Sequence, residues 1–292
     1  MKYKKRHLLL IKRKHLKYII IAFVAVVAVV TILLVTSANN RRSDLQNSVD
    51  AVAETGVIHI GLRGDIGSLC TYNSDTGVYE GLEKDVVDEI IRRLFGDEII
   101  VNYTEVNSET KDAMLKLGEI DISLGASVNL GSSGISYTSS FYSDGNAFLV
   151  MEDSISRIQA LTGKSIAVVQ GSNVAEDSEK DEEVTVLEEY LSDQGIQTKV
   201  KKYASYPEAI NALRSGHVNG VCANEISLKL YGIKGMLILP DRFLPVNYCV
   251  QVREDLGAFY TAIDEQIKSM QADGTMDSLI EKWNLINYAS LE

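Results

Sequence analysis

The sequence has few of the residues that build metal centres, disulfide frameworks or nucleophilic active sites. Its 292 residues include three cysteines, three prolines, one tryptophan and four histidines. It has no CxxC pair and no cluster of histidine and cysteine, so neither a metal site nor a cofactor is expected. The dispersed histidines give no support for a histidine-based catalytic triad. A hydrophobic fraction of 46% excludes a disordered chain.

Acidic residues are absent from the first 42 positions, and basic residues are scarce after them. Ten of the 29 basic residues precede residue 43, whereas all 40 acidic residues follow residue 42. Residues 43–292 therefore hold 19 basic and 40 acidic residues, a net charge of −21. Because so acidic a body repels a phosphate backbone, nucleic acid is not an expected partner.

Residues 18–36 form an uncharged apolar run, YIIIAFVAVVAVVTILLVT. As a helix it would span roughly 28 Å, close to the thickness of the hydrocarbon core of a bilayer. The run predicts a single-pass anchor in the cell membrane, with residues 1–17 as a basic cytoplasmic segment, residues 37–53 as a stalk and residues 54–292 outside the cytoplasm. A cleaved signal peptide is the alternative, because small residues follow the run at Thr36-Ser37-Ala38.

The three cysteines all lie in or beside apolar runs. Cys70, Cys222 and Cys249 are an odd number for an exported protein, although one disulfide bond stays open as an alternative. Their apolar surroundings predict buried thiols.

From residue 57 onward, short apolar strands alternate with helical patterns. Such alternation is typical of an α/β fold with mostly parallel sheets. The pattern restarts near residue 165, which predicts two lobes with a ligand cleft at the carboxyl ends of their strands. The predicted strands are 57–62, 99–106, 120–124, 147–151, 165–169, 198–203, 218–223 and 248–252, and the predicted helices are 82–95, 109–117, a long acidic helix from the loop at 170–173 to about 191, 206–215, 259–273 and 276–283.

Five segments follow one another in the order typical of a known family. They are GVIHIG at 56–61, GLEKDV at 81–86, LGEIDI at 117–122, GKSIAVVQGS at 163–172, and MQADGT with EKW between 270 and 283. Over about residues 54–285 the sequence resembles the extracytoplasmic solute-binding proteins of polar amino-acid ABC transporters, bacterial solute-binding family 3.

The resemblance implies a two-lobed fold of the type II periplasmic-binding-protein kind. Lobe one would comprise about residues 55–150 plus 250–292, and lobe two about residues 151–249. Ligand would close the lobes by hinge bending, and the closed form would dock on an ABC permease. Asp85 and Trp283, within the matching segments, are expected to shape packing rather than to touch ligand.

The resemblance also places a carboxylate-binding loop in lobe one. In the family this loop supplies backbone groups, a hydroxyl and an arginine. Here Gly125, Ser127 and Asn129 match its positions, whereas the arginine is missing near Ser132. Arg63 is the nearest replacement for it, with a solvated surface role as the alternative.

In lobe two, Ser172 and Asn173 fall at the start of the predicted acidic helix. Backbone N–H groups there would face an anion, or the two residues would form a plain N-cap. The ammonium-binding aspartate of the family aligns with Asn224, which accepts a hydrogen bond without a charge. Asp65 or Glu225 would then supply the compensating charge.

The family's ligand-stacking aromatic residue is replaced by Cys70. Tyr72 and Tyr142 are the nearby aromatic alternatives, with a role in the core or at the cleft rim equally open. The acidic stretch 176–183 is expected to be a solvated face.

Together with the apolar run at residues 18–36, the resemblance implies a membrane-tethered substrate-binding component of an ABC importer. The ligand would be a small polar solute, either an amino acid or a modified or dipeptide-like relative of one. A ligand-sensing ectodomain that acts through a partner protein is the alternative. A dehydratase-like enzyme is a further alternative, but no nucleophile–base pair is visible in the sequence, so catalysis is not expected.

Overall fold

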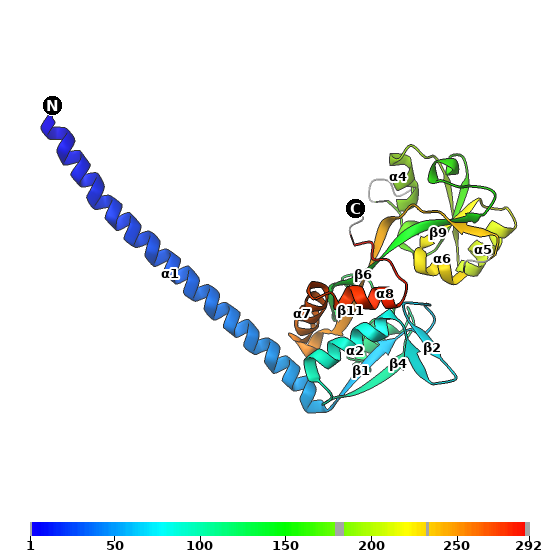
Figure 1. The fold of residues 1–292 in the computed structure, drawn as a ribbon, viewed down its shortest axis with the longest axis horizontal. Helices are drawn as coiled ribbons and strands as arrows, with labels where there is room; N and C mark the ends of the chain where they lie inside the picture. The colour runs from blue at the N-terminus through cyan, green and yellow to red at the C-terminus, as the bar shows by residue number, and fades with distance from the viewer. Residues whose placement is uncertain (1, 179–183, 232–233, 290–292) are drawn as a thin grey trace. The chain divides into compact units, whose positions relative to one another are not determined.

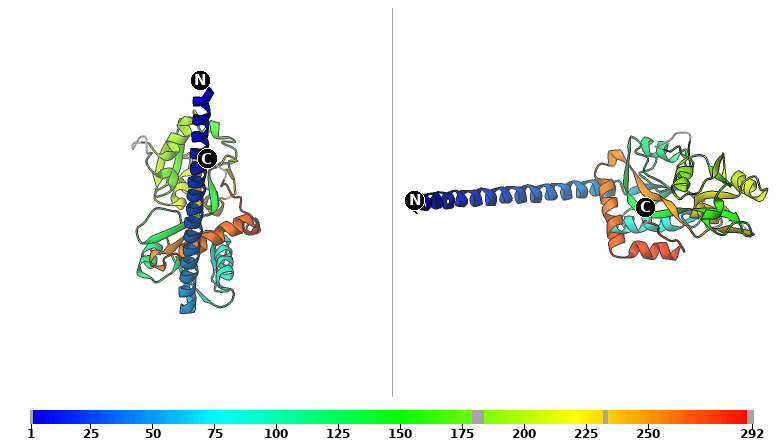
Figure 2. Two further views of the ribbon diagram at one scale, coloured as in Figure 1. Left: turned by 90° about the vertical axis from the view of Figure 1, so that its left-hand side faces the viewer. Right: turned by 90° about the horizontal axis from the view of Figure 1, so that it is seen from above.

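The N-terminal helix α1 runs without a break from Lys2 to Thr55 (Figure 2). The computed structural model describes residues 2–178, 184–231 and 234–289. The chain divides into two units, Met1–Ala51 and Val52–Glu292. Helix α1 includes residues 37–53, the polar segment that the sequence predicts as a stalk.

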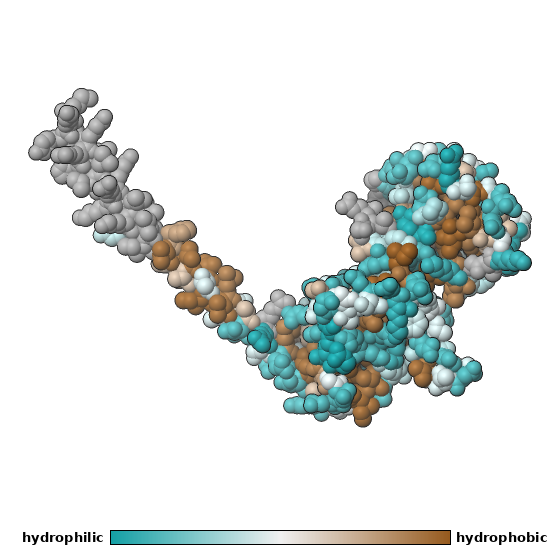
Figure 3. Space-filling view, viewed as in Figure 1, coloured by the Kyte–Doolittle hydropathy of each residue, from teal (hydrophilic) through white to brown (hydrophobic). Residues whose placement is uncertain are grey.

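Large apolar side chains between Phe23 and Val35 are exposed on α1 (Figure 3). The Thr31 and Thr36 hydroxyls donate to carbonyl oxygens one turn earlier in the helix, at 2.8 and 2.9 Å. These bonds satisfy the hydroxyls without water, as an apolar environment requires. Within the described residues, α1 is the one helix long and apolar enough to cross a membrane, a test that signal sequences also pass.

One nine-stranded sheet forms the centre of the Val52–Glu292 unit (Figure 1). Its order is β4-β1-β5-β11-β6-β9-β7-β8, and β10 pairs with β6. The strands are β1 (Val57–Leu62), β4 (Ile100–Glu105), β5 (Ile122–Ser123), β6 (Ile135–Met151), β7 (Ser165–Val169), β8 (Lys199–Tyr203), β9 (Gly220–Asn224), β10 (Met236–Ile238) and β11 (Phe243–Arg253).

Two long antiparallel strands join two parallel groups in this sheet. The group β4-β1-β5 and the group β9-β7-β8 are each parallel, as the strand–helix alternation predicts. Strands β6 and β11 pair antiparallel with each other. Strand β6 also pairs antiparallel with β9, and β11 with β5. Both strands are much longer than the predicted strands 147–151 and 248–252. The prediction missed their first residues because these are largely polar and hide the strand pattern.

We call β1, β4 and β5 with their helices the β1 half, and β7, β8 and β9 with theirs the β9 half. The helices of the β1 half are α2 (Leu82–Phe95), α3 (Lys111–Leu117), α7 (Phe259–Ala272) and α8 (Thr275–Lys282), and those of the β9 half are α4 (Val186–Asp193), α5 (Tyr206–Arg214) and α6 (Glu225–Tyr231). The β1 half also has a hairpin, in which β2 (Thr71–Asn73) pairs with β3 (Val78–Glu80). Short 3-10 turns lie at Ile158–Leu161, Asn173–Ala175 and Glu254–Leu256.

In the β9 half, the sheet is buried on both faces. Along β6, Phe148 and Val150 belong to one apolar cluster, which includes Leu187 of α4. Ala147 and Leu149 belong to a second cluster on the opposite face, with residues of α5 and α6. Since successive side chains of a strand point to opposite faces, uniformly apolar strands produce a core on each side.

The predicted long acidic helix after residue 173 is wrong. The chain forms only a 3-10 turn at Asn173–Ala175, and α4 begins at Val186. The helix starts there because Thr185 and Glu188 form a capping box, in which each side chain accepts the other's backbone N–H. Residues 179–183 of the predicted solvated face lie outside the described residues.

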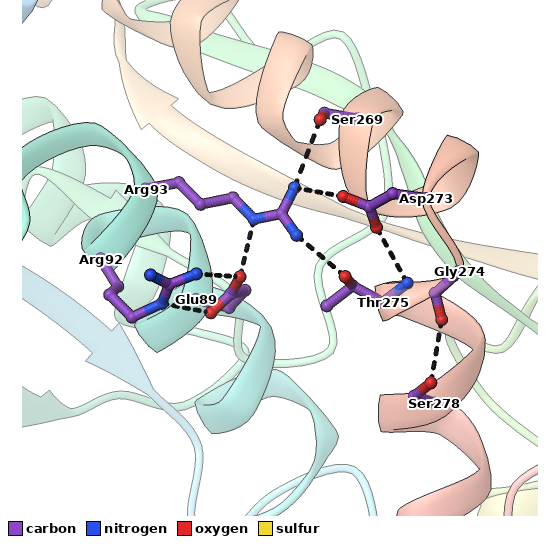
Figure 4. A network of polar contacts seen from close by, with 8 residues as sticks. All are labelled: Glu89, Arg92, Arg93, Ser269, Asp273, Gly274, Thr275 and Ser278. Carbon is purple, nitrogen blue, oxygen red and sulfur yellow. Dashed lines mark hydrogen bonds and ion pairs between the residues drawn. The ribbon is translucent and has the colours of Figure 1, made fainter.

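The C-terminal matching segment ties α7 and α8 to α2 (Figure 4). The Arg93 guanidinium donates to Glu89 at 2.7 Å, Asp273 at 2.9 Å and Thr275 at 2.9 Å. Nearby, Asp85 accepts the Trp283 indole N–H at 2.6 Å. Asp85 and Trp283 therefore have the packing roles expected of them.

All three cysteines are free and buried, which confirms the prediction of buried thiols. Burial raises the pKa of Cys249 to about 12, so this thiol is protonated at neutral pH. No disulfide bond links the cysteines, all of which lie within the described residues.

Candidate functional site

A cavity of about 690 Å³ is lined by residues of both the β1 half and the β9 half. It opens where strands β1 and β9 end, which is where ligands bind in open α/β sheets. Six of the nine residues predicted to bind ligand line it: Arg63, Asp65, Asn129, Ser172, Asn173 and Asn224. Three predicted residues, Tyr72, Gly125 and Ser127, do not.

Arg63 and Asp65 form an ion pair on the β1 side of the cavity. Arg63 Nε and Nη2 donate to the two Asp65 carboxylate oxygens at 2.5 and 3.1 Å, and Nη1 donates to Ser108 at 3.0 Å. The side-chain hydrogen bond to Asp65 raises the pKa of Arg63. Two of the five guanidinium N–H groups have no partner among the described residues, so they are available to a ligand carboxylate.

A buried glutamate holds the loop that forms the adjoining wall. Gly125 and Ala126 both have positive φ, 42° and 54°, and Ala126 lines the cavity. The Ala126 N–H donates to Glu83 Oε1 at 2.7 Å. Burial raises the pKa of Glu83 to about 8, although the Ala126 hydrogen bond and Lys111 lower it. This one contact fixes a backbone conformation that is costly for alanine.

Ser127 belongs to a buried polar cluster rather than to the cavity wall. Its hydroxyl donates to Gln251 Oε1 at 2.8 Å and accepts from Lys111 Nζ at 3.0 Å. Lys111 Nζ also lies 3.4 Å from the Gly125 carbonyl oxygen. Gly125 and Ser127 therefore act on the cavity only through the shape of the loop.

Asn224 lies at the end of β9 and has a buried carboxylate behind it. Its Nδ2 donates to Asp144 Oδ2 at 2.9 Å and to the Tyr248 hydroxyl at 2.8 Å. Burial raises the pKa of Asp144 to about 6, while the hydrogen bonds from Ile226 and Asn224 lower it. Nothing in the sequence around Asn224 marks Asp144, which lies 80 positions away.

Asn146 pairs with Asn224 across β6 and β9 and also lines the cavity. Its Nδ2 donates to the Leu244 carbonyl oxygen at 2.5 Å and to Asn173 at 3.3 Å. Its buried Oδ1 has no partner among the described residues. An unpaired buried acceptor is costly, so a ligand that donates to it gains binding energy. Sequence reasoning missed Asn146, because register decides which residue of β6 faces Asn224.

Ser172 and Asn173 line the cavity without a helix behind them. The Ser172 hydroxyl donates to the Val169 carbonyl oxygen at 2.7 Å, and Asn173 Nδ2 donates to Leu244 at 3.3 Å. The predicted helix start at Ser172 and Asn173 is wrong, because the 3-10 turn that follows has only three residues and supplies no helix dipole.

The aromatic wall of the cavity comes from residues that sequence reasoning missed. Tyr206 and Tyr231 stack with ring centroids 5.3 Å apart and line the β9 side. Tyr206 begins a helix, and Tyr231 ends one that the sequence pattern does not predict, so no local signal marks either.

The predicted aromatic candidates lie elsewhere. Tyr72 is half exposed and packs against Tyr79 on the β2–β3 hairpin, 4.9 Å between centroids. Tyr142 is buried and stacks on Tyr248, with 6.0 Å between ring centroids. It therefore has a role in the core rather than at the cleft rim.

Glu225 does not supply a charge to the cavity. Its carboxylate is buried and binds Arg242, Lys229 and the Tyr288 hydroxyl, each at 2.7 Å. Burial opposes ionisation, but these hydrogen bonds outweigh it and hold the pKa of Glu225 at about 2. The suggested compensation by Glu225 is therefore wrong.

Residues 58–286 match the family model described as "Bacterial extracellular solute-binding proteins, family 3". The chain belongs to this family. The predicted resemblance and the two-lobed α/β fold of the periplasmic-binding-protein kind are confirmed.

Relatives with known names share about a quarter of the residues. The ABC transporter glutamine-binding protein of Bacillus subtilis is 25% identical over 248 residues, which are 82% of this chain and 85% of that protein. The glutamine-binding protein of Geobacillus stearothermophilus is 27% identical over 175 residues. These are 58% of this chain and 62% of that protein, which is less than two thirds of its length. Among solved structures, an ancestral arginine-binding protein bound to arginine has a TM-score of 0.55 and 23% identity, covering 78% of this chain and 98% of that one.

Proposed function

We propose that this protein is the extracytoplasmic substrate-binding component of an ABC importer for amino acids or amino-acid-like polar solutes. The observation on which this depends is a cavity lined by both halves of a family-3 solute-binding fold. Its walls offer guanidinium donors at Arg63 and a carboxamide acceptor at Asn224. A zwitterion needs one group of each kind. The relatives named for glutamine and amino-acid ABC transport support the same class of ligand and an ABC permease as partner.

We infer that the two halves are the lobes and that the hinge lies where β6 and β11 pass between them. Residues Asn146–Leu149 already pair with β9, and Val246 pairs with Asp144. These pairings support crossings several residues before the predicted limits at 150 and 250. Hinge bending at two strands would close the cavity around the ligand.

We infer a binding role rather than a catalytic one. The Asp65 carboxylate, which lines the cavity, is engaged by Arg63 in a bidentate ion pair. A general base must be directed at its substrate, whereas this carboxylate is turned toward a guanidinium group. Recovery of bound solute chemically unchanged after long incubation is the expected result, and a converted product would contradict this inference.

Thermal unfolding of the full chain in detergent micelles tests the proposed function. The twenty proteinogenic L-amino acids and a set of glycine dipeptides are added one at a time, with sugars as negative controls. A ligand that binds only the folded state stabilises it by about 2.7 kcal/mol at a hundredfold excess over Kd. We expect at least one amino acid or dipeptide to raise the melting temperature.

Asn224→Ala is the variant that connects this result to the cavity. We expect it to abolish most of the ligand-induced rise, because the cavity loses a carboxamide acceptor. Asn102→Ala, at an exposed position of β4 outside the cavity, should leave the rise unchanged. No response of the wild-type chain to any of these solutes would overturn the proposed ligand class.

A further inference from the structure

Asp144 is a carboxylate buried directly behind the part of the cavity wall that Asn224 forms. It is 0% exposed and lies on β6, where the strand passes between the halves. Its Oδ2 accepts two hydrogen bonds, from Asn224 Nδ2 at 2.9 Å and from the Ile226 N–H at 3.0 Å. Its Oδ1 is buried without a partner among the described residues. Two hydrogen bonds compensate a buried charge only in part.

The ionised carboxylate determines which way the Asn224 carboxamide points. A carboxylate only accepts hydrogen bonds, so Asn224 must turn its Nδ2 toward Asp144. Its second N–H is used by the Tyr248 hydroxyl. The carbonyl oxygen is then the group of this side chain that is left for a ligand in the cavity.

We propose that Asp144 is a positioning residue, which turns Asn224 into an acceptor for the ligand's ammonium group and places a negative charge behind it. This inference rests on the proposed binding of amino acids. Asp144 places an anionic charge behind Asn224, which has none of its own. Glu225 is fully engaged by other side chains, and Asp65 is paired with Arg63. The carboxylate acts through the carboxamide, without touching the ligand.

Of the titratable groups that face Asp144, none other is expected to gain a proton when the pH falls from neutral to mildly acidic. Glu225 of α6 repels it but is itself held by Arg242 and Lys229. The phenols of Tyr142, Tyr206 and Tyr248 face it from β6, α5 and β11, and burial raises the pKa of each further above neutral. Glu83 faces Tyr248 from the β1 half.

These surroundings give the pH dependence of binding a definite sign. Asp144 has a pKa of about 6 in the ligand-free protein. A ligand ammonium group favours the ionised carboxylate, so affinity should be high above pH 6 and should fall as the pH drops below it.

The experiment is calorimetric titration of the full chain in detergent micelles at about pH 5, about pH 7 and about pH 8. The first two lie on either side of the Asp144 pKa, and Glu83, whose pKa burial raises to about 8, stays mostly protonated between them. The probes are the twenty L-amino acids and, for each one that binds, the des-amino acid that lacks only the ammonium group. Asp144→Asn keeps the shape and an acceptor for Asn224 but removes the charge. Asp264→Asn is the matched control, because Asp264 also accepts a backbone N–H of β6, from Ser139 at 2.6 Å, and does not line the cavity.

We expect Asp144→Asn to weaken amino-acid binding at pH 8 by roughly tenfold or more, which is the loss of a nearby partly desolvated charge. Binding of the des-amino acid should change by less than about twofold, because it has no ammonium group to respond. The wild-type affinity should fall at pH 5, and that of Asp144→Asn should not. Asp264→Asn should behave as the wild type does.

Three results would overturn the proposal, and they are distinguishable. Equal losses for the amino acid and its des-amino analogue would show a merely structural effect of Asp144. If the affinity of the wild-type chain for the amino acid does not fall at pH 5, the Asp144 charge has no role in binding. This result can be read even if Asp144→Asn fails to fold. Absence of binding by the wild-type chain to all twenty amino acids would overturn this inference, and the proposed function would fall with it only if the glycine dipeptides also failed to bind.

Discussion

Glu83 shows how much one buried side chain determines at this site. Its carboxyl group is 0% exposed, it fixes the loop at Ala126, and its Oε2 has no partner among the described residues. The sequence places Glu83 inside a matching segment at the start of a helix, where an acid is favoured by the helix N-terminus. Nothing local indicates that the side chain turns inward to the cavity loop.

The pKa of Glu83 predicts a pH-dependent stability. It rises from its ordinary 4.5 to about 8, so between these values the folded state holds a proton that the unfolded state has lost. The free energy of unfolding should therefore fall as the pH rises through this window, by at most ~1.4 kcal/mol per pH unit. Glu83→Gln should flatten this slope in urea unfolding curves measured between pH 5 and pH 8.

The control for this prediction is Glu80→Gln, which removes an exposed carboxylate on the neighbouring strand β3. It should keep the wild-type slope. An unaltered slope in Glu83→Gln would show that another group takes up the proton.

At the scale of elements, helix boundaries follow local side-chain chemistry more closely than apolar spacing. Helix α2 was predicted at its observed bounds, since its apolar positions recur at helical spacing and Gly96 ends it. The predicted acidic helix failed because charge spacing alone does not show where a helix starts. The capping box at Thr185 gives that information, and it is readable in the sequence as Thr-x-x-Glu.

Thr185→Ala should destabilise the β9 half through α4. The Thr185 hydroxyl accepts the Glu188 N–H at 3.2 Å, and the loss of such an N-cap costs about 1 kcal/mol. Amide hydrogen exchange in α4 should become correspondingly faster. Thr185→Ser keeps the accepting oxygen and should stay within a few tenths of a kcal/mol of the wild type. Equal destabilisation by both variants would contradict the capping role.

For the whole molecule, attachment of α1 decides whether the solute-binding unit stays at the membrane. Its apolar segment is long enough to cross a bilayer, and basic residues precede it in the sequence. We expect an uncleaved anchor, with the solute-binding unit outside the cytoplasm.

Intact-mass measurement of the protein from bacterial membranes tests this expectation. An anchored chain should keep its N-terminus and resist extraction by alkaline carbonate, because a spanning helix is released only by detergent. A soluble product whose sequence starts just after Thr36-Ser37-Ala38 would contradict the anchor and establish a cleaved signal peptide. Deletion of residues 2–42 serves as the control for extraction, since it removes the apolar segment.

Features that depend on neighbours along the chain can be read from the sequence. The uncharged run in α1, the helical spacing of α2 and α7 and the apolar strands β1, β7 and β9 are all local patterns, and five ordered segments were enough to indicate the family. Tertiary structure alone decided which polar groups meet. Asp144 lies 80 positions from Asn224, and Asn146 faces Asn224 only through the register of β6 on β9. Such pairings depend on how distant strands align, because a shift of one residue would turn each side chain to the other face.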